Sequence, residues 1–195
     1  MTPIGQFDGV LRVERPEWED VVALRLGEKR IVVLHGQIEE VLAQQVSKEL
    51  LYMESVGPEP IRVILNSVGG DVYDGLLIFD TIRDIAKKGI EVTIEVRGLA
   101  ASMAAIILQA ASIKRRTSSR YTRFLIHEIS SLSAGTTSEQ EEQVNELRKL
   151  NSMLRDILSE RTGRSVEEIE KMWKKTDVWF SADEALKFGL VDEVL

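Results

Sequence analysis

The chain has 195 residues, 44% of them hydrophobic and 29% charged, which predicts one globular domain with a substantial core. Its net charge of -7 argues against a nucleic-acid partner, because binding to phosphates requires a basic surface. The chain has no cysteine, which excludes disulfides and thiol catalysis. It has only two histidines, which argues against a His-rich metal site, so we expect no metal or other cofactor.

The first 29 residues are expected to form an N-terminal arm. Gly5, Gly9, Pro3 and Pro16 interrupt scattered apolar residues, which favours an irregular loop with one short strand near residues 21–26. Residues 1–14 lack the basic and apolar stretches of a secretory signal. Together with the absence of cysteine, this predicts a cytoplasmic protein.

Strands and helices alternate along the rest of the chain. Residue patterns predict strands at residues 31–34, 61–65, 90–96, 120–126 and 190–195, and helices at residues 39–55 and 74–88. Residues 66–71 are expected to form a turn. The repeated alternation is typical of a layered α/β fold with parallel strands.

A long amphipathic helix is predicted after residues 131–137, which are small and polar and favour a loop or a weak edge strand. Ser138 and Glu141 have the spacing of a capping box, and the helix that they open should end near Arg161, before Gly163. One face of this helix carries an apolar stripe, formed by Val144, Leu147, Leu150, Leu154 and Ile157. Two further capping signatures predict short helices near the C-terminus, at Ser165 with Glu168 and at Ser181 with Glu184.

A single polar side chain lies among small apolar residues in the stretch Gly98-Leu99-Ala100-Ala101-Ser102-Met103-Ala104-Ala105. We expect a strand, a tight turn and a helix that begins at Ser102. A hydroxyl at a helix start lies near free backbone N–H groups, which suits a nucleophile and the oxyanion that it generates. The alternative is that Ser102 only caps the helix or fills space. The apolar run of residues 99–113 is interrupted by polar residues and is too short to cross a membrane, so no membrane partner is expected.

Two later residues could complete a catalytic serine site. His127 follows the next predicted strand, and the ends of neighbouring parallel strands lie at one edge of a sheet, so Ser102 and His127 can converge. Asp177 could supply the acid that orients the histidine, and the Ser67-Val68-Gly69-Gly70 turn could present N–H groups to an oxyanion. Taken singly, His127 could instead be a core histidine, Asp177 a loop residue or helix cap, and the glycine pair a simple turn.

Taken together, these stretches resemble the ClpP family, the proteolytic subunit of ATP-dependent Clp proteases, over about residues 30–195. The family's nucleophile motif, Gly-Met-Ala-Ala-Ser-Met, is similar to Gly98-Leu99-Ala100-Ala101-Ser102-Met103, and its Met-Ile-His-Gln-Pro to Leu125-Ile126-His127-Glu128-Ile129. Its Ile-Asn-Ser-Pro-Gly-Gly-Ser-Val resembles Leu65-Asn66-Ser67-Val68-Gly69-Gly70-Asp71-Val72. Its closing pattern resembles Asp177, then Ala182-Asp183-Glu184-Ala185, then Gly189-Leu190-Val191-Asp192.

The resemblance implies a serine endopeptidase with the ClpP/crotonase-like fold. This is a layered α/β arrangement of repeated strand-strand-helix units with a projecting handle helix, here at about residues 131–162. Ser102 would be the nucleophile, His127 the general base and acid, and Asp177 the carboxylate that orients the histidine. Residues 30–195 would form the single peptidase domain and residues 1–29 an arm or axial loop. No cofactor is implied.

The resemblance also implies binding groups and partners. The backbone N–H groups of Gly70 and Met103 would form the oxyanion hole, and Gly69 and Val72 would lie at the substrate site. The substrate would be an unfolded polypeptide or peptide, delivered by an AAA+ unfoldase into a chamber of heptameric rings. The rings are expected to pair face to face through the handle helix.

Departures from the family pattern keep other functions open. Val68 and Ile129 replace two prolines, and Thr176 stands where the family has an arginine that makes a ring-to-ring ion pair beside the catalytic aspartate. A catalytically silent ClpP-like ring subunit or a phage assembly scaffold protein is therefore the main alternative. A crotonase-type enzyme would need no serine–histidine pair, and His127 argues against a serine–lysine peptidase.

Overall fold

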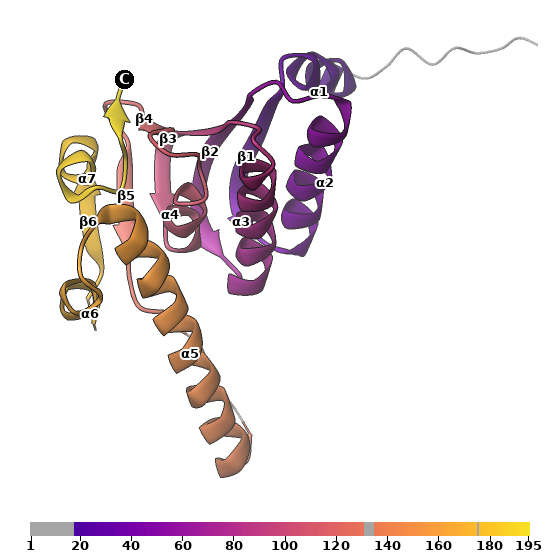
Figure 1. The fold of residues 1–195 in the computed structure, drawn as a ribbon. Coiled ribbons are helices and arrows are strands. Elements are labelled where there is room, and N and C mark those ends of the chain that lie inside the picture. The colour runs from indigo at the N-terminus through magenta and orange to yellow at the C-terminus, as the bar shows by residue number, and fades with distance from the viewer. Residues whose placement is uncertain (1–17, 131–134, 175) are drawn as a thin grey trace, which may run out of the picture.

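The computed structural model describes residues 18–130, 135–174 and 176–195, and Figure 1 shows a sheet with helices packed against it and one helix that leaves the body. Seven helices lie in these residues: α1 Trp18–Glu28, α2 Glu40–Val56, α3 Val72–Lys87, α4 Met103–Leu108, α5 Thr137–Thr162, α6 Val166–Trp173 and α7 Ala182–Phe188. Seven strands accompany them: β1 Ile31–Ile38, β2 Ile61–Gly70, β3 Val92–Ala101, β4 Arg116–Ser118, β5 Arg123–Ile126, β6 Val178–Ser181 and β7 Glu193–Val194.

The described strands form one sheet in the order β1-β2-β3-β4-β7, with β5 paired to β3 and to β6. All pairs are parallel except β5–β6, which is antiparallel. The expected layered α/β fold with parallel strands is confirmed. Strands β4 and β6 are not among the predicted strands, because β4 is short and polar and β6 depends on pairing with a distant strand.

The core lies between the sheet and helices α2, α3 and α4, which pack side by side. Residues along β2 alternate between buried and exposed positions, and the buried apolar side chains are Ile61, Val63 and Leu65. These face apolar residues of the helices, including Leu50 of α2 and Ile82 of α3. The alternation of β2 and the helical spacing of α2 and α3 therefore point to the same buried layer. None of the described helices is long and apolar enough to span a membrane.

Four local expectations are corrected. Residues 21–26 belong to helix α1 and not to a short strand, and residues 66–70 continue strand β2 instead of forming a turn. β3 likewise runs on to Ala101, directly before Ser102. The capping box of α5 is formed by Thr136 and Glu139, because the extended backbone of Thr136 lets its hydroxyl accept from the Glu139 N–H. The expected loop at residues 131–134 lies outside the described residues.

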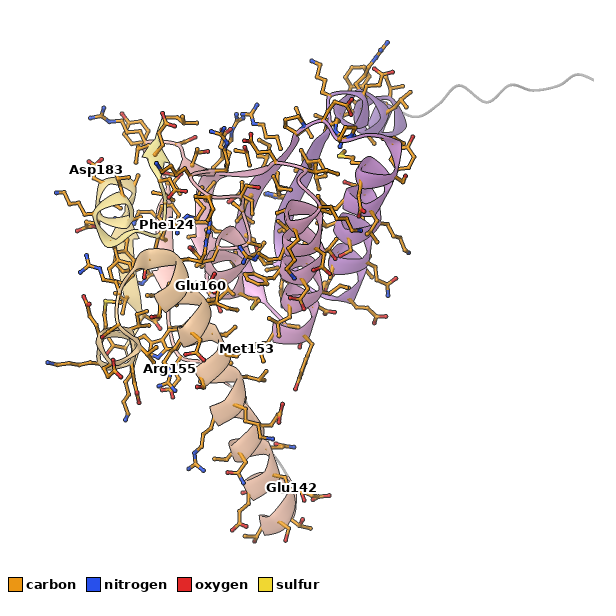
Figure 2. All side chains as sticks on the ribbon, in the orientation of Figure 1. Phe124, Glu142, Met153, Arg155, Glu160 and Asp183 are labelled. Carbon is orange, nitrogen blue, oxygen red and sulfur yellow. The ribbon has the colours of Figure 1, made fainter. Side chains whose placement is uncertain are left out.

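Helix α5 projects from the body, as the resemblance implied (Figure 1). Its predicted apolar stripe divides between two environments. Leu150 and Leu154 are 6% and 4% exposed and pack within the chain itself, whereas Val144, toward the free end, is 42% exposed. Figure 2 shows Glu142 on that free end and Met153 nearer the body. The part of the stripe nearest the body therefore belongs to this subunit's own core and is not free to pack on another subunit.

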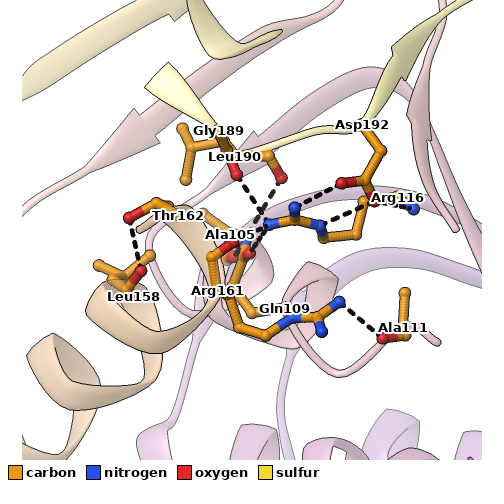
Figure 3. Close-up of polar contacts among 10 residues, drawn as sticks. All are labelled: Ala105, Gln109, Ala111, Arg116, Leu158, Arg161, Thr162, Gly189, Leu190 and Asp192. Carbon is orange, nitrogen blue, oxygen red and sulfur yellow. Dashed lines mark hydrogen bonds and ion pairs between the residues drawn. The ribbon is translucent and has the colours of Figure 1, made fainter. Parts of the chain in front are cut away.

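The base of α5 is joined to the C-terminal segment by a buried arginine (Figure 3). Arg116 donates hydrogen bonds to both carboxylate oxygens of Asp192, to Gln109 Oε1, and to the carbonyls of Arg161 and Gly189. Burial alone would raise the pKa of the Asp192 carboxyl, but the hydrogen bonds and charge of Arg116 outweigh burial and hold that pKa below its usual value. Arg116 thus ties α4, α5 and the C-terminus together.

Replacing this carboxylate should reduce stability in a pH-dependent way. The ion pair contributes fully at a pH above the unfolded pKa of about 4, and its contribution is lost as the pH falls through the lowered folded-state pKa. We predict that Asp192→Asn lowers the free energy of unfolding at pH 7 by about 2 kcal/mol and flattens its fall at acidic pH. Chemical denaturation at a series of pH values from about 3 to about 7 measures both the loss of stability at neutral pH and its dependence on acidic pH.

The matched control is Asp156→Asn, since Asp156 is exposed on α5. This variant should unfold within about 0.5 kcal/mol of the wild type at every pH. An Asp192→Asn protein as stable as the wild type at pH 7 would show that the Arg116 network does not hold the C-terminal segment.

Candidate active site

Ser102 occupies the junction between β3 and α4 in an unusual backbone conformation. Its φ of 55° and ψ of -125° lie in a region that residues with a side chain rarely adopt. Such a conformation costs about 1–3 kcal/mol and persists only where neighbouring groups enforce it. Although Ser102 is at the N-cap position, its hydroxyl makes no capping hydrogen bond to the described residues of α4. The interpretation of Ser102 as a helix cap is therefore wrong, and its hydroxyl remains available for another role.

Two contacts hold the Ser102 turn. The Ser102 N–H donates a 2.9 Å hydrogen bond to the Leu125 carbonyl of β5. On the other side lies Gly69, whose φ is +88° and where an added Cβ would come within 2.6 Å of the Ala101 carbonyl oxygen and 2.7 Å of Ser102 Cβ. Only a residue without a side chain fits there. Gly69 therefore packs directly against the backbone turn at Ser102, and it is not among the described residues that line the cavity beside this serine.

Strand register brings His127 to the same edge of the sheet as Ser102. β3 and β5 are parallel, and Ala101 pairs with Leu125, so Ser102 and His127 each follow directly after neighbouring strands. Both residues line one cavity of about 680 Å³. No hydrogen bond joins the two side chains in the described part of the chain, and catalytic hydrogen bonds often shorten only when substrate binds.

Asp177 lies close to the His127 imidazole. β5 and β6 are antiparallel, with Ile126 opposite Val178, and continuing this register by one residue sets His127 opposite Asp177. Asp177 Oδ1 is 3.7 Å from His127 Nδ1, and the two side chains are 64% and 25% exposed. The carboxylate is therefore close enough to interact with the histidine ring.

The groups expected to bind an oxyanion also line the cavity. Gly70, Val72 and Met103 all contribute to its wall. Met103 is the first residue of α4, so its N–H has no acceptor within the helix and can donate to a ligand. An added Cβ at Gly70 would overlap the Ile38 carbonyl, which explains the glycine there.

The apolar end of this cavity was not predicted from the sequence. It is lined by side chains from α4, α5 and α6, among them Ile106, Leu154 and Trp173, together with Ile129 after β5. These residues converge only in the folded chain, so no local pattern could have grouped them. The other histidine, His35, is not among the described lining residues and instead contacts Asn66, with 3.1 Å between His35 Nδ1 and Asn66 Nδ2.

Comparison with known proteins adds a consistent result. A family model described as Clp protease matches residues 14–195, so the match begins within the expected N-terminal arm. The ATP-dependent Clp protease proteolytic subunit of Bacteroides fragilis is 36% identical over 174 residues, which covers 88% of this chain and 81% of that protein. Proteolytic subunit 1 of Prochlorococcus marinus is 38% identical over 172 residues, which covers 88% of this chain and 86% of that protein.

The close contact at Gly69 can be tested by adding one methyl group. We predict that Gly69→Ala displaces the Ser102 turn and reduces hydrolysis of a p-nitrophenyl ester by about 100-fold, because a shift of about 1 Å at a reacting group has that effect. Gly89→Ala is the matched control, since Gly89 has a φ of +89° but nothing within 4 Å of an added Cβ. Its activity should stay near that of the wild type. Equal activities of the two variants would contradict the assigned role of Gly69.

Proposed function

This chain belongs to the Clp protease family, and we propose that Ser102, His127 and Asp177 carry its serine peptidase chemistry. The observation that supports the assignment best is the arrangement around His127. His127 lines the same cavity as Ser102, and its Nδ1 lies 3.7 Å from Asp177 Oδ1. This is the order of groups that a catalytic serine requires.

The proposed reaction is acyl transfer in two halves. His127 Nε2 takes the proton of the Ser102 hydroxyl as its oxygen attacks the peptide carbonyl, and the N–H groups of Gly70 and Met103 bind the resulting oxyanion. The protonated histidine then gives its proton to the leaving amine, and an acyl-enzyme remains. Water, deprotonated by His127, attacks this ester, and the proton returns to Ser102 as the acid is released. Asp177 stabilises the protonated imidazole throughout.

The alternatives are less well supported. The relatives are named proteolytic subunits, which disfavours a catalytically silent ring subunit or a phage scaffold. Val68 and Ile129, which replace the family's prolines, both line the cavity, so the substitutions alter its wall without removing a proposed catalytic group.

The names of the relatives also suggest which partners this chain has. Proteolytic subunit 3 of Synechococcus is named as part of an ATP-dependent Clp protease. It is 34% identical to this chain over 180 residues, which covers 91% of this chain and 88% of that protein. We propose that this chain likewise cleaves unfolded polypeptides delivered by an AAA+ ATPase and assembles into paired heptameric rings. The projecting α5 supports the pairing, since its outer half lies away from the body. Thr176 cannot make the bidentate carboxylate contact of an arginine, so α5 should carry most of the contact between rings.

The role of His127 can be separated from that of His35. We predict that His127→Asn lowers kcat/KM for a short fluorogenic peptide by at least about 1000-fold, because the serine loses its base. His35→Asn should retain nearly full activity, since His35 contacts Asn66 and not Ser102. The reverse result would overturn the assignment of the base.

The proposed pairing of rings predicts the effect of a charge on the outer half of α5. Val144→Asp should split the double ring into single rings, since a charge in an apolar contact lacks a partner. Val144→Thr keeps the shape and should remain assembled. Sedimentation velocity distinguishes the two states, and a Val144→Asp protein that sediments like the wild type would remove this part of α5 from the contact. Leu150 and Leu154 do not suit this test, because they are buried within the subunit.

A further inference from the structure

The cavity beside Ser102 has a polar end and an apolar end. Ser102 and His127 define the polar end, where the peptide bond would react. Ile106 follows Met103 by one helical turn of α4, so the cavity continues along that helix into apolar surroundings. Among the described lining residues, the acidic and basic side chains are those of Asp71 and His127. The apolar end therefore offers no ionic partner to a charged substrate side chain.

Trp173 is the largest side chain at the apolar end, and its position is fixed. It is the last residue of α6, is 2% exposed, and belongs to the hydrophobic core. An ion pair of 2.9 Å between Arg155 Nη1 and Glu170 Oε2 joins α6 to α5, and Figure 2 labels Arg155 beside α6. The Trp173 carbonyl also accepts a 3.2 Å hydrogen bond from the Thr176 N–H, in the turn that leads to Asp177.

We propose that Trp173 limits the size of the substrate side chain next to the bond that is cleaved. The inference rests on the proposed function, because it requires Ser102 to attack a peptide carbonyl. When that carbonyl lies at Ser102 and the Met103 N–H, the side chain of the same substrate residue is the one nearest to the apolar end. The indole occupies part of that space, so apolar side chains of small or medium size fit and large aromatic ones do not.

A role as core filler alone makes a different prediction. Removing a core side chain loosens the site and should lower kcat/KM for all substrates by a similar factor. Removing a wall of the binding pocket should change the ratio of kcat/KM between substrates, because a single methylene group in an apolar pocket changes discrimination by about 10-fold to 200-fold. The ratio between substrates therefore separates the two roles.

The test uses fluorogenic peptides that differ only in the residue before the cleaved bond, which is alanine, leucine or phenylalanine. In Trp173→Leu, the ratio of kcat/KM for phenylalanine to that for alanine should rise by about 10-fold or more. Trp179→Leu is the matched control, since Trp179 lies on β6, is 49% exposed and is not among the described lining residues. Its ratio should equal that of the wild type. Thermal unfolding of each variant records whether it is folded.

Each outcome decides a separate point. A Trp173→Leu enzyme that is slower on all three peptides by one factor would overturn the role of Trp173 and leave the proposed function intact. A wild-type protein that cleaves none of the peptides would overturn the proposed function, and this inference with it. If Trp173→Leu does not fold, Trp173→Phe removes less volume and should shift the ratio in the same direction, and an unchanged ratio there would also count against the proposal.

Discussion

The proposed active site depends on one serine that the surrounding residues hold in a backbone conformation that serine rarely adopts. Gly69 packs closely against the backbone at Ser102, and the Ser102 N–H donates a hydrogen bond to the Leu125 carbonyl of β5. Helix α4, which begins at the next residue, is buried along its whole length, so it cannot relax outward to relieve the strain. The packing of the core thus keeps a hydroxyl at the edge of the sheet, where it does not cap its own helix.

The far end of the same helix is fixed by a second group of contacts. Gln109, just after α4, bonds to Arg116 and to the Leu190 carbonyl, and Arg116 in turn holds Asp192. The C-terminal segment that carries β6 and Asp177 is therefore tied to the helix that begins after Ser102. The antiparallel pairing of β5 with β6 then sets the carboxylate opposite His127. Three proposed catalytic groups from distant parts of the chain owe their relative positions to these contacts.

Local patterns predicted the elements whose burial is visible over a few residues. The alternation of β2, the helical spacing of α2 and α3, and the caps at Ser165 and Ser181 are confirmed. β6 could not be predicted in this way, because its four residues form a strand only by pairing with β5. For the same reason, the residues alone offer Asp177 only as one candidate acid, and the family resemblance, not geometry, implies its place beside His127. The stripe on α5 was predicted as one face, but periodicity does not reveal which half is covered by the same chain.

The most direct measurement is the mapping of a covalent adduct by mass spectrometry after reaction with a serine-directed fluorophosphonate. Reaction requires both an accessible hydroxyl and a base beside it. The account predicts a single adduct on the wild-type chain, located at Ser102, and none on the His127→Asn variant. An adduct on another serine, or one at Ser102 that forms equally fast without His127, would contradict it.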